Sequence, residues 1–135
     1  METKTLERNI LKEMKKEAEN ARVDYVISMA GKIAKEICPH LKRKSFIWQR
    51  GATIIVIAYD DYDTNSVFIY DEDVLICVKT APGVSHIEFK PVRLYNPDNF
   101  IDSEKKNKAV TNVMRFLDEN YENIVKEFFA SLSNE

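Results

Sequence analysis

Hydrophobic residues recur at steps of three and four along the first quarter of the chain. The positions are Leu6, Ile10, Met14, Ala18, Ala21, Tyr25, Met29, Ile33 and Ile37. This spacing is typical of one face of a helix, and Pro39 follows its last member as a normal stop signal. We therefore predict a helix over residues 5–37, about 50 Å long, with one continuous apolar stripe.

The middle of the chain consists of short runs rich in Ile, Val, Phe and Tyr, separated by turn-like clusters. These runs predict four or five antiparallel strands, at residues 44–49, 52–59, 66–70, 74–79 and 86–94. A second long helix is expected to reach about Ser131, with Asp102-Ser103, followed by Glu104, offering its N-cap. The order of elements predicts an α+β fold in a single domain over residues 1–135.

The central runs IIVIAY, VFIY and VLICV are apolar at consecutive positions. An antiparallel sheet with one face in water alternates apolar and polar residues instead. We therefore expect both faces of the sheet to be covered, by a helix on each face, by another copy of the chain or by a partner. A six-residue strand spans about 20 Å, so the helices should extend beyond the sheet. Together these features favour a homo-oligomer or a complex.

The composition narrows the class of protein. Apolar residues make up 44% and charged residues 31%, as in a folded soluble domain. Three isolated glycines exclude the glycine-rich phosphate loops of nucleotide enzymes, and no cofactor is expected. The first residues contain no signal-like apolar segment, and no apolar run is long enough to span a bilayer. We expect a cytoplasmic protein with no membrane partner, in which Cys38 and Cys77 are reduced.

Charge is unevenly distributed along the chain. Residues 1–50 hold 12 Lys and Arg against 7 Asp and Glu, whereas residues 51–135 hold 8 against 15. Six acidic residues and no basic one lie between Arg50 and Lys79. Such separation can steer a charged partner, so we predict contact with a protein that has a basic surface. The predicted contact residues are Asp60, Asp61, Tyr62, Asp63, Asp71, Glu72 and Asp73.

Part of this acidic segment matches a calcium-binding loop by spacing. Asp61, Asp63, Asn65 and Glu72 occupy positions 1, 3, 5 and 12 of an EF-hand loop. However, an EF-hand loop lies between helices, whereas the flanking residues here predict strands. An extended run after Asn65 places Glu72 on the order of 20 Å away from it. We therefore interpret the segment as acidic hairpin turns and expect no metal site.

An enzymatic alternative rests on a second motif. Asp73 opens one predicted strand, and Glu88 and Lys90 lie on the next in the spacing E-x-K. This pattern resembles that of the PD-(D/E)xK nuclease family, although the Pro that precedes the Asp in that family is missing. The resemblance implies that Asp73 and Glu88 bind Mg²⁺ and that Lys90 positions or activates water. The competing interpretation is that Glu88 and Lys90 lie on the solvent-facing side of a strand.

Nucleic-acid binding has one candidate stretch, L41-K-R-K-S-F-I-W-Q-R50. On a strand, Lys44, Phe46, Trp48 and Arg50 share a face, as a base-stacking platform requires. The net charge of −2 and the nearby acidic segment argue against such a groove.

Our first hypothesis is therefore a non-enzymatic domain of the inhibitor, immunity or adaptor type. It would bind a macromolecule through the acidic hairpin region and an apolar sheet or helix surface. The nuclease is the alternative.

Overall fold

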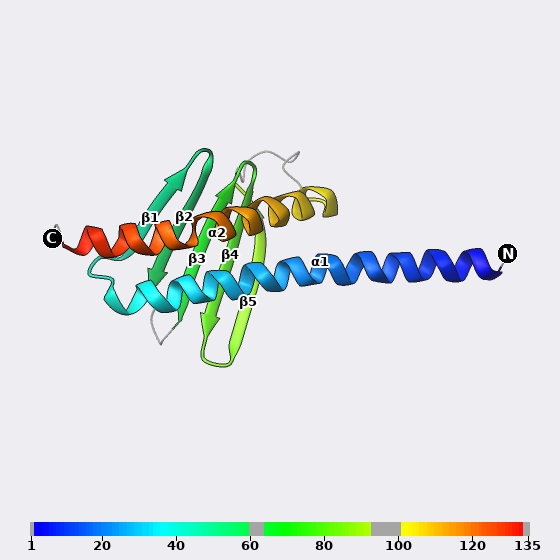
Figure 1. The fold of residues 1–135 in the computed structure, drawn as a ribbon, viewed down its shortest axis with the longest axis horizontal. Helices are drawn as coiled ribbons and strands as arrows, with labels where there is room; N and C mark the ends of the chain where they lie inside the picture. Colours follow the sequence, from blue (N-terminus) through cyan, green and yellow to red (C-terminus); the bar gives the residue numbers. More distant parts are fainter. Residues whose placement is uncertain (1, 60–63, 93–100, 134–135) are drawn as a thin grey trace.

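The computed structural model describes residues 2–59, 64–92 and 101–133 (Figure 1). The elements in order are α1 (Glu2–Ile37), a short 3-10 helix (Cys38–His40), β1 (Ser45–Arg50), β2 (Thr53–Tyr59), β3 (Asn65–Asp71), β4 (Val74–Ala81), β5 (Val84–Pro91) and α2 (Ser103–Leu132). The predicted α+β fold is confirmed, and most boundaries lie within three residues of those expected. The side chain of Asp102 caps α2 by accepting a hydrogen bond from the Lys105 backbone N–H at 2.8 Å.

The five strands form an antiparallel meander in the order β1-β2-β3-β4-β5. Each strand pairs with its sequence neighbour, since turns of two residues connect β1 to β2, β3 to β4 and β4 to β5. Each of these turns contains one residue with a positive φ, namely Gly51, Glu72 and Gly83. Glycine adopts a positive φ at little steric cost. The register aligns residues across all five strands into straight rows, such as the helix-facing row through Val67 and Val78.

Both helices cover the same face of the sheet and lie side by side (Figure 1). They run in the same direction, because Glu19 of α1 accepts a hydrogen bond from Asn107 and Tyr25 donates one to Asp118 at 2.8 Å. Together with the helix-facing rows of the sheet they enclose the hydrophobic core. Of the three ways in which both faces could be covered, one helix on each face is therefore wrong. The apolar runs indicated that both faces of the sheet are apolar. However, α1 and α2 also bury apolar surface against each other, which requires both helices to lie on the same face.

The first part of α1 extends beyond the rest of the described structure, past β5 (Figure 1). Every residue from 3 to 18 is exposed, whereas Val26, Ala30 and Ile33 are fully buried. The overhang expected from element lengths is thus confirmed. The predicted single apolar face is wrong, because each step of four residues turns the stripe by about 40° on a helix of 3.6 residues per turn. Over the 27 residues from Leu6 to Ile33 the stripe passes to roughly the opposite side of α1.

Candidate functional site

The face of the sheet turned away from the helices consists of three cross-strand rows. The central row is Ile47, Val56, Phe68, Cys77 and Glu88, in the order β1 to β5. On one side lies the row Gln49, Ile54, Tyr70, Leu75 and Lys90, and on the other the row Ser45, Ala58, Ser66, Lys79 and His86. Apolar side chains therefore occupy the centre of this surface over β1 to β4, and charged side chains lie along β4 and β5. We call it the open face.

None of the described elements covers the open face, since α1 and α2 both lie on the other side. Ile47 is 62% exposed and Val56 and Phe68 are half-buried, whereas Cys77 of the same row and Ser66 of the neighbouring row are buried. A contiguous apolar surface of this kind marks an interaction site more often than scattered apolar residues do. The open face is therefore the feature of the described structure most suited to binding.

The β5 end of the open face carries a chain of hydrogen-bonded charges. Glu88 lies 2.9 Å from His86 Nε2 and 3.2 Å from Lys90 Nζ. These hydrogen bonds, from His86 first and then from Lys90, lower the pKa of the Glu88 carboxyl, and the same carboxylate raises the pKa of Lys90. The negative charge of Glu88 is thus neutralised within its own strand. Lys79 lies opposite His86 on β4, so the positive charges predominate at this end.

The structure brings together two of the three residues proposed for a nuclease. Glu88 and Lys90 form an ion pair, as above, but Asp73 lies in the turn between β3 and β4. The Asp73 carbonyl accepts a hydrogen bond from the Val92 N–H, just beyond the end of β5. Glu88 pairs with Cys77, four residues along β4 from Asp73, a separation of roughly 13 Å along the strand. The two carboxylates do not converge as a shared Mg²⁺ would require.

The acidic residues at the turn from β3 to β4 differ in their surroundings. Asp71 is on the helix-facing side and buried, and its carboxylate accepts a hydrogen bond from Asn112 of α2 at 3.3 Å. Burial raises the pKa of Asp71, an effect that the Asn112 hydrogen bond partly offsets. Glu72 and Asp73 are exposed. This turn shares a small hollow with two lysines of α2, Lys105 and Lys108. The turn therefore presents two accessible acidic groups rather than three.

The remaining predicted contact residues, Asp60, Asp61, Tyr62 and Asp63, lie outside the described residues. Strand β2 ends before this segment, β3 follows it, and β4 follows the next turn. The flanking elements are therefore strands and not the helices of an EF-hand, as predicted. Over residues 2–59, 64–92 and 101–133, no group of three or more His, Cys, Asp or Glu side chains is placed to hold a metal ion.

The basic-aromatic stretch does not form a base-stacking platform. Phe46 packs edge-on against Phe128 of α2, with ring centroids 5.1 Å apart, and Trp48 packs on Phe116 at 5.8 Å. The Trp48 indole N–H also donates a hydrogen bond to the carboxylate of Glu127. The predicted shared face exists, but α2 covers it. These aromatic rings belong to the core and are not available to stack on bases.

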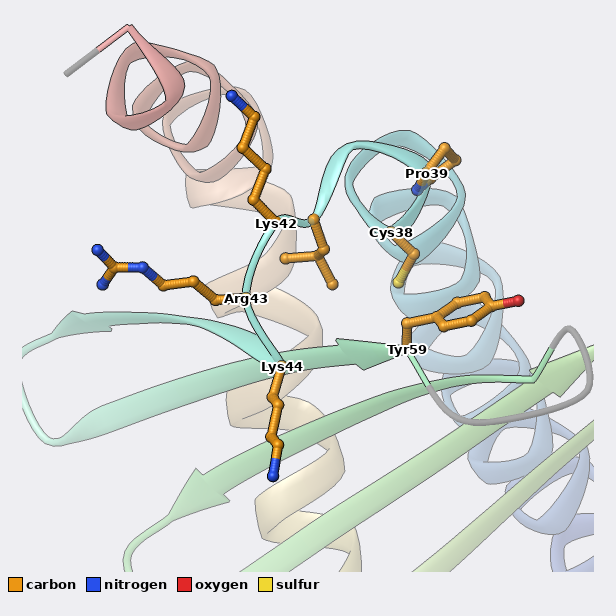
Figure 2. Close-up of a pocket in the computed structure, with 7 residues that line it drawn as sticks. Cys38, Pro39, Lys42, Arg43, Lys44 and Tyr59 are labelled. Atoms are coloured by element: carbon orange, nitrogen blue, oxygen red, sulfur yellow. The ribbon is translucent and has the colours of Figure 1, made fainter. Parts of the chain in front are cut away.

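A hollow of about 660 Å³ lies where α1 ends, beside the β2 residue Tyr59. Its lining includes three consecutive basic residues, Lys42, Arg43 and Lys44. Figure 2 shows these three side chains directed away from one another, with Lys42 toward the C-terminal end of α2 and Lys44 away from it. Because the cations do not converge, the hollow lacks the geometry of an anion site.

Sequence reasoning did not name the apolar residues of the open face as a site. The signal was present, because the consecutive apolar runs indicated a sheet without a wet face. Choosing the members of that face requires the register, which depends on pairing between strands. The sequence-based candidates were instead charged residues, which attract attention as chemistry but lie at the ends of the strands or on β5.

Comparisons of the chain with protein-family models, with curated protein sequences and with solved structures find no match. Neither helix, over the residues described, has an apolar stretch long enough to cross a membrane. The functional interpretation therefore depends on the geometry of the open face and of α1.

Proposed function

We propose that this chain is a non-enzymatic binding domain that engages another protein through its open face. The observation that supports the proposal is the central row, in which Ile47, Val56 and Phe68 form a continuous apolar surface that no described element covers. Removing apolar surface from water stabilises a complex by roughly 25 cal/mol per Å² before the costs of association. A protein partner supplies the apolar surface that this row lacks.

The charged residues around the open face fit the rim of an interface. Lys79 and Lys90 lie on the open face itself, and Glu72 and Asp73 are in the turn next to Tyr70 and Leu75, which belong to the same row as Lys90. Polar and charged groups at the rim of an interface contribute mainly to orientation and association rate. An inhibitor, immunity or adaptor role uses such a surface, with apolar contacts at its centre and charges of both signs around it.

Site-specific photo-crosslinking in the native host tests this proposal. A photoreactive amino acid at position 47 should yield covalent adducts to protein, identified by mass spectrometry. The same amino acid at position 126, on the exposed side of α2, is the matched control. We expect adducts from position 47 at a yield at least several times that from position 126. Equal yields, or none from position 47, would contradict a binding role for the open face.

A further inference from the structure

The described structure contains two apolar surfaces against which no other described element packs. One is the open face, and the other is the exposed part of α1 from Thr3 to Ala18, which we call the overhang. Leu6, Ile10 and Met14 of the overhang are 61%, 55% and 60% exposed. An amphipathic helix buries its apolar side against another element. Neither the sheet nor α2 buries the apolar side of the overhang. Both elements lie on other sides of α1 or do not extend as far as the overhang.

The apolar side of the overhang is also its acidic side. Leu6 and Met14 lie about 40° from Ile10 around the helix, and Glu7, Glu13 and Glu17 lie within roughly 60° of it. The basic residues of the overhang lie at least roughly 120° away from Ile10. They are Lys4, Arg8, Lys12, Lys15 and Lys16. The side of the helix with Leu6, Ile10 and Met14 is thus apolar and negatively charged, so it suits an apolar surface with positive charges.

The open face has matching dimensions and charge. Its apolar row from Ile47 on β1 to Cys77 on β4 crosses three strand spacings, about 14 Å. The stripe from Leu6 to Met14 covers eight residues, about 12 Å along the helix. Beyond Cys77 the row ends at Glu88 on β5, and Lys79 of β4 and Lys90 of β5 lie on either side of it. At the corresponding end of the stripe, Glu17 follows Met14 by one turn.

We propose that the open face binds the overhang of a second copy of this chain, with Leu6 over β1 and Glu17 near Lys79 and Lys90. In this arrangement the apolar stripe covers the apolar row, and the acidic end of the helix lies on the basic end of the face. The whole overhang, 16 residues or about 24 Å, is long enough to cross the five strands. The C-terminal half of α1 covers the opposite face of the same sheet in the same manner (Figure 1).

This inference rests on the proposed binding role of the open face and specifies its occupant. The two surfaces are different, so the contact joins copies head to tail, and repeated contacts form a ring or an open chain. A single helix on a sheet buries less surface than a standard interface, so association should depend on protein concentration. The expected signature is a weight-average mass that rises above 15.7 kDa as concentration increases.

The first experiment compares two neighbouring residues of the overhang by sedimentation equilibrium of the full chain. Ile10→Asp places a charge in the centre of the stripe and should weaken self-association at least roughly tenfold. Leu11→Asp is the matched control, since Leu11 is 65% exposed and lies about 100° away around the helix. It should leave association close to that of the wild type. Circular dichroism should show that both variants are folded.

The second experiment exchanges the charges of the two surfaces. A helix variant carries Glu13→Lys with Glu17→Lys, and a sheet variant carries Lys79→Glu with Lys90→Glu. Each variant alone places like charges together and should associate at least roughly tenfold more weakly than the wild type. An equimolar mixture should regain association, because the overhang of the helix variant, now basic, then meets the open face of the sheet variant, now acidic.

The outcomes separate this inference from the proposed function. A wild-type chain that stays monomeric to millimolar concentration overturns the second-copy inference, whereas crosslinks from position 47 to a different protein would still support the binding role. Loss of association in the sheet variant alone, without an effect of Ile10→Asp, would indicate that two sheets meet and overturns the role of the helix. If the equimolar mixture of the two variants does not regain association, the proposed charge complementarity between the overhang and the open face is wrong.

Discussion

At the scale of single residues, Asp71 shows how the fold changes the role of a charged group. Its neighbours in the sequence indicated a solvent-exposed acidic turn, yet its side chain lies on the helix-facing side of β3 beside Asn112 of α2. Strand alternation accounts for this position, because Asp71 has the same parity as Val67 and Ile69, which face the helices. The carboxylate is therefore partly removed from water, and a partner cannot reach it easily.

This position predicts a specific pH dependence. Burial raises the pKa of Asp71 above its ordinary value of 3.8, so the folded state retains the proton to higher pH than the unfolded state does. The stability that this proton contributes is present below pH 3.8 and declines as pH rises through the folded pKa. Asp71→Asn should remove the decline. Relative to the wild type, its free energy of unfolding should rise between pH 4 and pH 7, by less than about 1 kcal/mol.

Urea unfolding at several pH values measures this difference, and Asp73→Asn is the control, because Asp73 lies in the same turn but is exposed. A difference between Asp71→Asn and the wild type that stays constant from pH 4 to pH 7 would show that burial of Asp71 has no effect on its titration.

At the scale of elements, α1 has two functional halves within one continuous helix. The half from Val26 to Ile37 packs on the sheet and on α2, whereas the overhang contacts neither. A helix of this length is marginal in water when nothing packs against it. The overhang is therefore stabilised by continuation from the packed half, and in the proposed assembly by association, rather than by the core of its own chain.

Two substitutions of the same type compare the halves directly. Ile33→Ala leaves a cavity beneath a fully buried residue and should lower the free energy of unfolding by roughly 2–4 kcal/mol. Ile10→Ala removes the same atoms from an exposed position of the same helix, and the change should be within about 0.5 kcal/mol at low protein concentration. Chemical unfolding of both variants at micromolar concentration provides the measurement. Equal losses would mean that the overhang is packed within the monomer.

At the scale of the whole molecule, the arrangement is asymmetric between the two faces of the sheet. Two helices cover one face, and no described element covers the open face. An apolar face of this kind favours association and, if it is left uncovered, aggregation. On the edge strand β5, Lys90 and Pro91 are the kind of residues that limit unspecific pairing with another strand.

Hydrogen exchange tests this description of the whole molecule. In dilute solution, the backbone amides of residues 3–18 should exchange at least roughly a hundredfold faster than those of Val26–Ile37, because nothing buried holds the overhang closed. Raising the protein concentration should slow exchange in the overhang and in the strands of the open face together. Strong protection of residues 3–18 at all concentrations would contradict an overhang that is free in the monomer.

Several features of the fold followed from the sequence alone. The steps of three and four predicted the first long helix, the N-cap signal at Asp102-Ser103 predicted the second, and the apolar runs predicted the strands, because these patterns reflect local backbone geometry. The consecutive apolar positions also indicated that both faces of the sheet carry apolar residues, and the element lengths indicated helices longer than the sheet. The sequence also identified candidate charged residues but not their positions in the fold. The side chain of Asp71 lies on the helix-facing side of the sheet, and Asp73 lies far from Glu88.

Only the tertiary structure decided how these elements combine. Whether α2 lies beside α1 or on the other face depends on contacts between residues about ninety positions apart, such as Tyr25 with Asp118. The rows of the open face depend on the register of all five strands, which a shift of one residue would reverse. The sequence does not determine whether the Leu6–Met14 stripe is exposed, because that depends on which side of α1 the core buries. Local periodicity determines each element, whereas long-range packing determines which of its surfaces remain exposed.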